Sequence, residues 1–294
     1  MSVTQAAPID PMRSTAPDRY VDDVVDVRTG GPAPGHATRT PHFTAWHEAG
    51  RVQLRHRLPP HRIDNDVAGL LADELFAPGW LNGSDLFERL LTGVVLSSAE
   101  DAASAWTLFY RNTLDRLSDL DEGAAAAGSL AAYAPVYRHA AELVEVGSVL
   151  ELGSCFGFLS LLLADRARVT ASDVTANTVR LLTTVAPRLG RRLDTVICDA
   201  ARVPRPDQSF DTVLAVHLLE HLHPDHGRAV LTEMQRLAAR RVVVAVPFEA
   251  EPTAAFGHVR VFDLGALGAL GRDTGWAFRH YEHHGGWLVL DRPG

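Results

Sequence analysis

The chain has 294 residues, 46% of them hydrophobic and 22% charged, which is typical of a soluble globular protein of about two domains. Its net charge of −8 disfavours nucleic-acid binding, and its 28 basic side chains other than histidine are all arginine, which excludes lysine-dependent pyridoxal phosphate and P-loop chemistry. With two distant cysteines, no apolar run long enough to cross a membrane and no secretory signal, we expect a cytoplasmic protein without membrane contact.

The first part of the chain is predicted to be an arm followed by a hairpin. Residues 1–40 are rich in Pro, Gly, Asp and Thr with little periodic apolar content, so we expect a flexible arm. One exception is 20–27, where alternating apolar residues favour a short strand. From Phe43, two alternating runs flank a turn at 48–50, which predicts a β-hairpin.

Helical patterns follow the hairpin, with apolar residues three and four positions apart. We expect these helices at 67–76, 84–95, 102–120 and 128–144. Ser84 is the predicted N-cap of the second helix, and Pro135 is expected to interrupt the fourth. Residues 41–128 are therefore predicted to form a hairpin plus a helical subdomain.

The last part of the chain, 129–294, alternates short apolar runs with helical segments, which is typical of parallel sheets with crossover helices. The runs lie at 148–152, 168–173, 194–199, 210–216 and 241–247. Two more runs around Gly285 and Gly286 favour an antiparallel hairpin at one edge. We predict a doubly wound α/β fold with a mostly parallel, seven-stranded sheet.

A glycine-containing turn follows the first of these strands, where the chain reads Glu151-x-Gly153-x-Cys155-x-Gly157. Glycines in such a turn let the backbone turn sharply and let a ligand lie close to it. The spacing departs from the G-x-G-x-x-G fingerprint, which disfavours a dinucleotide.

Acidic residues end the next two strands. Asp173 lies twenty residues after Gly153, where a carboxylate can accept hydrogen bonds from two ribose hydroxyls; the alternative is that it caps the helix beginning at Thr175. Asp199 and Ala200 follow the third strand, and 204–222 reads PRPDQSFDTVLAVHLLEHL.

Together, these motifs over 130–291 resemble those of class I S-adenosylmethionine-dependent methyltransferases, whose turn usually reads Glu-x-Gly-x-Gly-x-Gly; Cys155 departs from it. The resemblance implies a Rossmann-like fold, S-adenosylmethionine as cofactor, Asp173 on its ribose and Asp199 on its adenine amino group. The cofactor-binding residues implied by these motifs are Glu151, Gly153, Ser154, Cys155, Gly157, Asp173, Val174, Asp199, Ala200 and His217.

The segment from His217 to His221 also fits H-x-x-E-H, the inverted zinc-protease signature. That motif needs both histidines on one face of a helix, whereas here it directly follows a buried strand. We therefore favour the methyltransferase interpretation. His258 lies in GHVRVFD, and Asp263 in the same run is the expected N-cap of the next helix.

More narrowly, 70–95, 106–114 and the runs around Gly153 and Asp173 resemble mycofactocin oligosaccharide methyltransferases of actinobacteria. This resemblance implies methyl transfer to a glucose hydroxyl, with the region 41–128 and the terminal hairpin as the lid and acceptor groove. A poor nucleophile of this kind is helped by a general base, for which the order of preference is His221, His217 and His258.

Several alternatives stay open. The acceptor is an oligosaccharide or another small molecule such as a quinone, phenol or polyketide, and the chain is alternatively a non-catalytic protein that binds S-adenosylmethionine. We expect no metal site, although His217, Glu220 and His221 offer ligands by which a divalent ion would lower the pKa of the hydroxyl. A nicotinamide dehydrogenase is the weakest alternative. The oligomeric state is not predicted.

Overall fold

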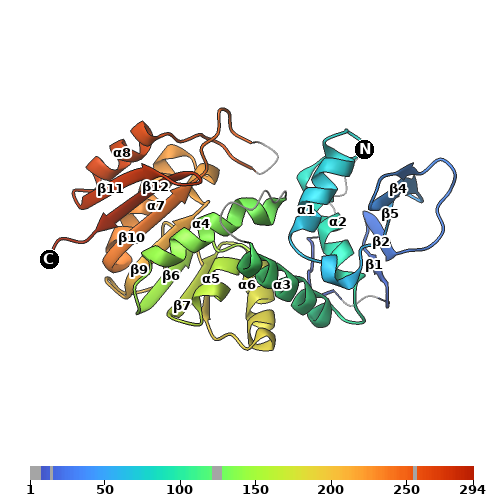
Figure 1. The fold of residues 1–294 in the computed structure, drawn as a ribbon, viewed down its shortest axis with the longest axis horizontal. Helices are drawn as coiled ribbons and strands as arrows, with labels where there is room; N and C mark the ends of the chain where they lie inside the picture. The colour runs from blue at the N-terminus through green and yellow to red at the C-terminus, as the bar shows by residue number, and fades with distance from the viewer. Residues whose placement is uncertain (1–7, 14–15, 121–127, 254–256) are drawn as a thin grey trace. The chain divides into compact units, whose positions relative to one another are not determined.

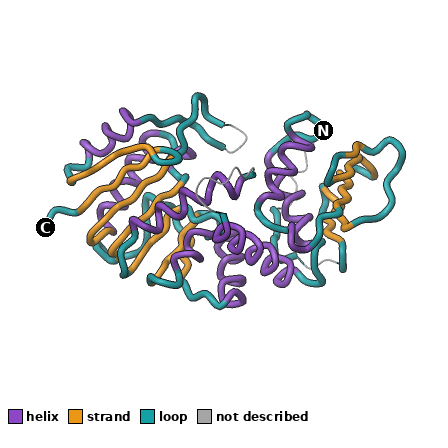
Figure 2. Tube along the Cα trace, viewed as in Figure 1, coloured by secondary structure: helices purple, strands orange, loops and turns teal. Residues whose placement is uncertain are grey.

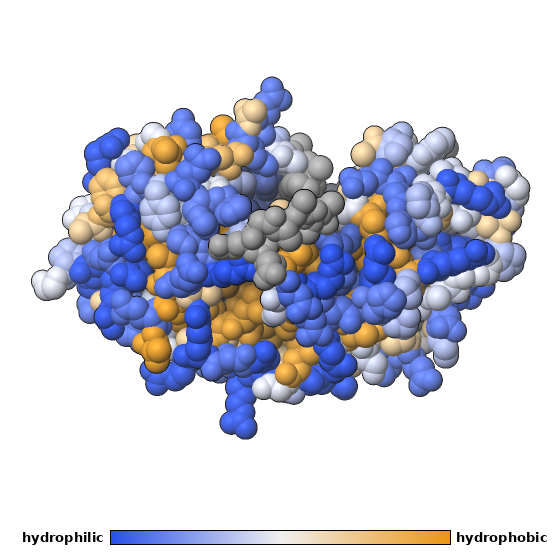
Figure 3. Space-filling view, in the orientation of Figure 1, coloured by the Kyte–Doolittle hydropathy of each residue, from blue (hydrophilic) through white to orange (hydrophobic). Residues whose placement is uncertain are grey.

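The computed structural model describes residues 8–13, 16–120, 128–253 and 257–294 (Figure 1). The chain divides into two compact units, Met1–Ala131 and Ala132–Gly294. Polar and charged side chains cover much of the face shown in Figure 3. Within the described ranges, no helix is both long and apolar enough to span a membrane.

The first unit contains a five-stranded sheet with the order β1-β2-β5-β4-β3. Figure 2 draws the strands of the chain in orange and its helices in purple. Its strands are β1 (Arg19–Val21), β2 (Val25–Thr29), β3 (Thr38–Arg39), β4 (Phe43–Glu48) and β5 (Arg51–His56). The predicted hairpin after Phe43 is confirmed as the antiparallel pair β4 and β5. The predicted strand at 20–27 is two strands, β1 and β2, which pair antiparallel.

The structure corrects the flexible-arm prediction for the segment 19–39, which holds three strands of this sheet. Tyr20, Val25 and Val27 are buried, and β2 pairs in parallel with β5, so a few apolar residues anchor a segment that is otherwise polar. Other parts of the predicted arm, 1–7 and 14–15, lie outside the described residues.

Helices follow the sheet in the first unit, so this unit is mixed α/β rather than a hairpin with helices. They are η1 (Pro60–Arg62), α1 (Asp66–Leu71), the π-helix η2 (Ala72–Phe76), α2 (Ser84–Leu96) and α3 (Ala102–Asp119). The predicted N-cap of α2 is wrong by one residue, because Gly83 caps the helix with φ 99° and Ser84 is its first residue. A Cβ on Gly93 of α2 would lie 2.5 Å from Val27 Cγ2, so the absence of a side chain lets α2 pack closely on β2.

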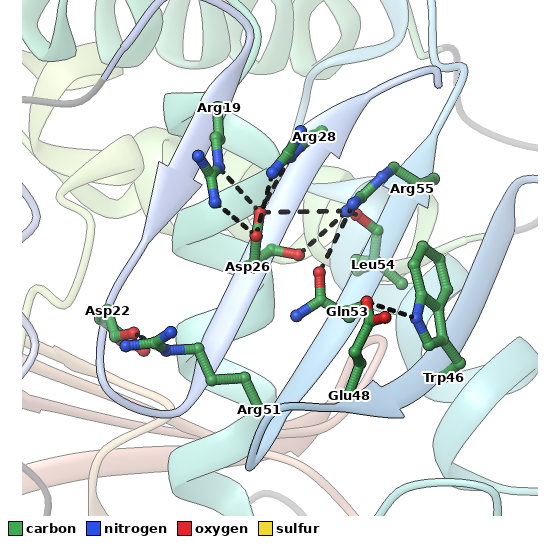
Figure 4. Close-up of polar contacts among 10 residues, drawn as sticks. All are labelled: Arg19, Asp22, Asp26, Arg28, Trp46, Glu48, Arg51, Gln53, Leu54 and Arg55. Carbon is green, nitrogen blue, oxygen red and sulfur yellow. Dashed lines mark hydrogen bonds and ion pairs between the residues drawn. The ribbon is translucent and has the colours of Figure 1, made fainter. Parts of the chain in front are cut away.

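Buried carboxylates in the first unit are paired with arginines (Figure 4). Asp26 of β2 accepts hydrogen bonds from Arg19 Nη2 at 2.7 Å and Arg28 Nε at 3.2 Å. Burial alone would raise the pKa of Asp26, but the two guanidinium groups lower it to about 2. The Arg55 guanidinium lies beside the same carboxylate, 4.8 Å from the centre of the Trp46 ring.

The second unit contains a seven-stranded sheet with the order β11-β12-β10-β9-β6-β7-β8. Its strands are β6 (Ser148–Leu152), β7 (Arg168–Asp173), β8 (Asp194–Ile197), β9 (Phe210–Val216), β10 (Ala238–Val246), β11 (Ala277–Glu282) and β12 (Gly286–Asp291). β6 to β10 are parallel, whereas β11 and β12 form the predicted antiparallel hairpin at one edge. The predicted α/β fold with a mostly parallel, seven-stranded sheet is confirmed.

Helices cover both faces of this sheet (Figure 1). They are α4 (Ser129–Leu143), α5 (Phe158–Leu163), α6 (Ala176–Val185), η3 (Ala186–Leu189), η4 (Leu219–His221), α7 (Pro224–Leu237) and α8 (Leu264–Asp273). Pro135 does not interrupt α4, which runs through it. Alternate residues of β9 point to opposite faces, so Val213 packs in the core with Met234 of α7 and Leu214 packs in the core with Val136 of α4.

Candidate functional site

The turn after β6 contains three residues in the left-handed region, Gly153 (φ 66°), Cys155 (φ 49°) and Gly157 (φ 72°). A Cβ on Gly153 would lie 2.7 Å from Leu218 Cδ1, so this position requires glycine for space as well as for conformation. Cys155 takes the strained conformation that glycine usually supplies at this position, and its side chain is exposed. The turn therefore forms in spite of the substitution.

Two polar residues at this turn are buried, Glu151 near the end of β6 and Ser154 in the turn itself. Glu151 accepts a hydrogen bond of 2.5 Å from Ser160 Oγ of α5, and burial raises the pKa of Glu151 to about 7. Ser154 donates its N–H to Ser172 of the neighbouring strand β7. Glu151 thus ties the strand to the helix after the turn, and its role toward a cofactor stays a prediction.

Asp173 at the end of β7 holds the turn in place. Its Oδ2 accepts the N–H of Cys155 at 3.0 Å, and its Oδ1 accepts the N–H of Thr175 at 2.8 Å. The carboxylate is only partly buried, and each oxygen has a second lone pair. Thr175 is the N-cap of α6, which begins at Ala176, so Asp173 binds the N–H of the capping residue rather than capping the helix itself. Its remaining lone pairs leave the ribose alternative available. The next side chain, Val174, is 71% exposed.

Asp199 follows β8 and is also held by local contacts. Its Oδ1 accepts the N–H of Ala201 at 2.8 Å and lies 2.8 Å from Nε2 of His226. The backbone bond and then His226 hold the pKa of Asp199 below its usual value. His226 is a contact that we did not predict, since it comes from α7, 27 residues farther along the chain.

His217 and Glu220 follow β9; Glu220 is almost fully buried, and His217 is partly buried. His217 has φ 54°, its Nε2 has no hydrogen-bond partner among the described residues, and burial lowers its pKa to about 4. Glu220 is 1% exposed, and neither of its carboxylate oxygens has a partner within that part of the chain. Burial raises the pKa of Glu220 to about 8, and His217 Nδ1 lies 3.8 Å from its Oε1, beyond hydrogen-bond distance.

The segment around Glu220 is a 3₁₀ turn, η4, rather than an α-helix. It therefore lacks the helix that an H-x-x-E-H zinc protease needs to present both histidines on one face. This agrees with our preference against a protease.

His221 and His258 lie together although 37 residues separate them in sequence. Their ring centroids are 4.8 Å apart at an interplanar angle of 85°. The Nδ1 of His258 is 2.7 Å from Oε2 of Glu249, and Val259 donates its N–H to the carbonyl of Glu220 at 2.9 Å. Burial lowers the pKa of His221, although this side chain is the most exposed of the three histidines.

These side chains form one cluster at the carboxyl ends of the neighbouring parallel strands β9 and β10. The sequence suggested His217, His221 and His258 as separate candidates, and Glu249 was missed because nothing near it in sequence indicates a contact with His258. Gly153 and Asp173 lie at the same edge, because β6 and β7 also run parallel in this sheet.

Residues 149–240 match the family described as "Methyltransferase domain". The matched range begins in β6 and ends in β10, so it includes the turn, Asp173, Asp199 and η4 but not His258. No curated protein matches the chain.

Solved structures similar to this chain include three methyltransferases. Magnesium protoporphyrin IX methyltransferase from Synechocystis, with bound S-adenosylmethionine, is 18% identical with a TM-score of 0.46, over 61% of this chain and 90% of that one. An S-adenosylmethionine-dependent methyltransferase from Aquifex aeolicus is 15% identical with a TM-score of 0.45, over 60% and 96%. One from Methanosarcina mazei is 18% identical with a TM-score of 0.43, over 54% and 97%.

Proposed function

We propose, from the match of residues 149–240 to a methyltransferase domain family, that the chain transfers a methyl group from S-adenosylmethionine to a sugar hydroxyl. The family match supports S-adenosylmethionine as the cofactor. The observation that carries the proposal is the common edge of the parallel sheet, where the glycine turn, Asp173 and the histidine cluster all lie.

The residues at this edge fit S-adenosylmethionine. Gly153 has no side chain, so the backbone of the turn can pack closely on Leu218. Asp173 keeps free lone pairs that can accept hydrogen bonds from ribose hydroxyls. Val174, which is largely exposed, offers apolar surface to an adenine ring, and Asp199 offers an acceptor to its amino group. The remaining contacts proposed are those of the turn, Glu151, Ser154, Cys155 and Gly157, together with Ala200 and His217. When bound, the cofactor supplies an electrophilic methyl group for in-line displacement.

A sugar hydroxyl needs to lose its proton as the new bond forms, and the histidine cluster is proposed for this step. His221 is preferred in the metal-free chain because it is exposed and because burial lowers its pKa, which keeps the ring neutral. His217 is partly buried against Glu220 and the Tyr133 ring, and Nδ1 of His258 already contacts Glu249. They remain the second and third candidates.

The proposed acceptor is a glucose hydroxyl of the mycofactocin oligosaccharide. The support for this choice is the resemblance of 70–95 and 106–114 to methyltransferases of that glycan. A quinone, phenol or polyketide is the second candidate, because the family match does not distinguish acceptors. A non-catalytic role is disfavoured because Asp173 and Asp199 are both present at the strand ends.

The experiment is a transfer assay with methyl-labelled S-adenosylmethionine, the purified chain, and glucose oligosaccharides, quinones and phenols as acceptors. We expect label in the oligosaccharide fraction, with a mass increase of one methyl group, and much less label with Asp173→Ala at subsaturating S-adenosylmethionine. Label in a quinone or phenol alone would contradict the sugar acceptor. No transfer to any acceptor, in a chain that binds the cofactor, would favour the non-catalytic role.

A further inference from the structure

The cluster after β9 and β10 has the chemistry of a metal site. Glu220, His221 and His258 each offer one ligand atom, and these atoms all lie within 4.8 Å of one another. Each of the three atoms therefore lies within about 2.8 Å of a common centre, compared with the ~2.0–2.2 Å of zinc bonds to imidazole nitrogen and carboxylate oxygen. Small side-chain adjustments would close this difference.

A second observation at this place is the carboxylate of Glu220. It is almost fully buried, yet both of its oxygens are without a hydrogen-bond partner among the described residues. A buried polar group usually has a partner, and one that does not requires an explanation such as an ion. A cation between Glu220 and the two histidines would satisfy this carboxylate.

A third observation is the support behind the histidines. The Nδ1 of His258 contacts Glu249, whose other oxygen accepts a 2.6 Å hydrogen bond from Thr253 Oγ1. The His221 ring lies next to the backbone of Gly257, where an added Cβ would be 3.7 Å from His221 Nδ1. A histidine that binds a metal through one ring nitrogen usually donates the N–H of the other to a carboxylate or a backbone carbonyl. That hydrogen bond orients the ligating nitrogen toward the ion.

The backbone joins the two halves of the cluster. Val259 donates its N–H to the carbonyl of Glu220 at 2.9 Å, and Arg260 Nε donates to the carbonyl of Leu219 at 2.9 Å. These two bonds fix the segment that carries His258 against η4, so the ligands are brought together before an ion arrives.

We infer that Glu220, His221 and His258 bind a divalent transition-metal ion of the zinc type. Two imidazoles and one carboxylate favour zinc, manganese or iron over magnesium or calcium, which prefer oxygen ligands. Three protein ligands leave a coordination position open. This departs from our expectation that no metal is bound.

If the proposed function is correct, the open coordination position of the ion can bind the acceptor hydroxyl. A sugar hydroxyl bound there would have a lowered pKa, and the ion rather than His221 would then activate it. In that state His221 is a ligand and Glu249 a positioning residue.

The test is calorimetric titration of zinc into the chain after removal of metals with EDTA. We expect one ion per wild-type chain, at least hundredfold weaker binding in Glu220→Gln and His258→Ala, and tenfold to hundredfold weaker binding in Glu249→Gln. His223→Ala is the matched control, because this exposed histidine is two residues from His221 and outside the cluster; it should bind zinc as the wild type does. Circular dichroism checks that each variant is folded.

The inference is overturned if wild-type chain takes up no zinc at 1 mM, or if Glu220→Gln and His258→Ala bind it as tightly as His223→Ala, since other histidines would then hold it. S-adenosylhomocysteine is titrated separately into the metal-free chain. Binding of that compound without binding of zinc refutes the metal site alone, whereas binding of zinc alone refutes the proposed function.

Discussion

Two buried carboxylates, one in each unit, have opposite environments. Asp22 of the first unit is 3% exposed and accepts hydrogen bonds from Tyr20, from the N–H groups of Val24 and Val25, and from Arg89 Nη1 at 2.8 Å. Burial acts to raise its pKa, but Arg89 and the backbone bonds hold that pKa below its usual value.

Glu220 of the second unit is just as buried, at 1% exposure, but has no such partners within the described part of the chain, and its pKa is raised. A buried acid with a full set of donors is part of the framework of its unit. A buried acid without them costs stability, and such a cost is typical of a site that awaits a ligand.

The largest expected effect is on the free energy of unfolding, which should depend strongly on Asp22 and only weakly on Glu220. Asp22→Asn leaves the Arg89 guanidinium, which is itself buried, without its buried partner, and should lower the free energy of unfolding by about 3–5 kcal/mol. Glu220→Gln replaces a side chain that is largely protonated at neutral pH, and should change the metal-free chain by less than about 1 kcal/mol. Urea denaturation followed by circular dichroism measures both.

Asp85→Asn is the control for Asp22. Asp85 also pairs with Arg89, at 2.7 Å, but its side chain is 63% exposed, so its loss should cost less than about 1 kcal/mol. Equal losses for the Asp22 and Asp85 variants would show that burial does not decide the strength of these pairs.

The second prediction concerns how the stability of the folded chain changes at acid pH because of His56 in the first unit. His56 of β5 is buried, with Nε2 3.0 Å from Ser97 Oγ, and burial lowers its pKa from 6.5 to about 4. Between these values the unfolded chain binds a proton that the folded chain does not, so stability falls as pH decreases from 6.5 to 4, by up to about 3 kcal/mol. Urea midpoints measured across this range should fall steeply in wild type and less in His56→Gln; equal slopes would contradict a neutral His56.

Cofactor binding gives the third prediction. Asp173→Ala removes the acceptors for the ribose and the anchor of the Cys155 N–H, and should weaken S-adenosylmethionine binding by about 2–3 kcal/mol, or thirtyfold to more than a hundredfold. Asp194→Ala, at the opposite end of β8, should bind normally. A change of less than threefold in a folded Asp173 variant would remove this residue from the ribose site.

The smallest effect is expected at the adenine site. Asp199→Asn keeps one acceptor oxygen, so binding should weaken by at most about tenfold, and less than in Asp173→Ala. Equilibrium dialysis with labelled cofactor compares the two variants. If Asp199→Ala as well as Asp199→Asn binds like wild type, the residue has no part in the adenine pocket.

The sequence predicted the second unit better than the first, for a physical reason. In the second unit the inner strands β6, β7 and β9 are runs of mostly buried residues covered on both faces, so they are visible locally. In the first unit, β1 and β2 are held by pairing with each other and with β5, a long-range effect that outweighs the polar composition of 19–29.

The candidate site was predicted in the same uneven way. Asp173 and Asp199 could be found because each ends a predicted strand. The contact between His221 and His258 depends on the pairing of β9 with β10 and on the docking of Val259 on Glu220, neither of which leaves a local pattern. The partner of His258, Glu249, could not be predicted for the same reason.

The most direct test of the central claim is calorimetric titration of the wild-type chain with S-adenosylhomocysteine and, separately, with NAD. The account predicts saturable binding of S-adenosylhomocysteine at one site per chain and no heat with NAD, because the turn after β6 lacks the dinucleotide spacing. Binding of NAD without S-adenosylhomocysteine, or of neither compound, would contradict it.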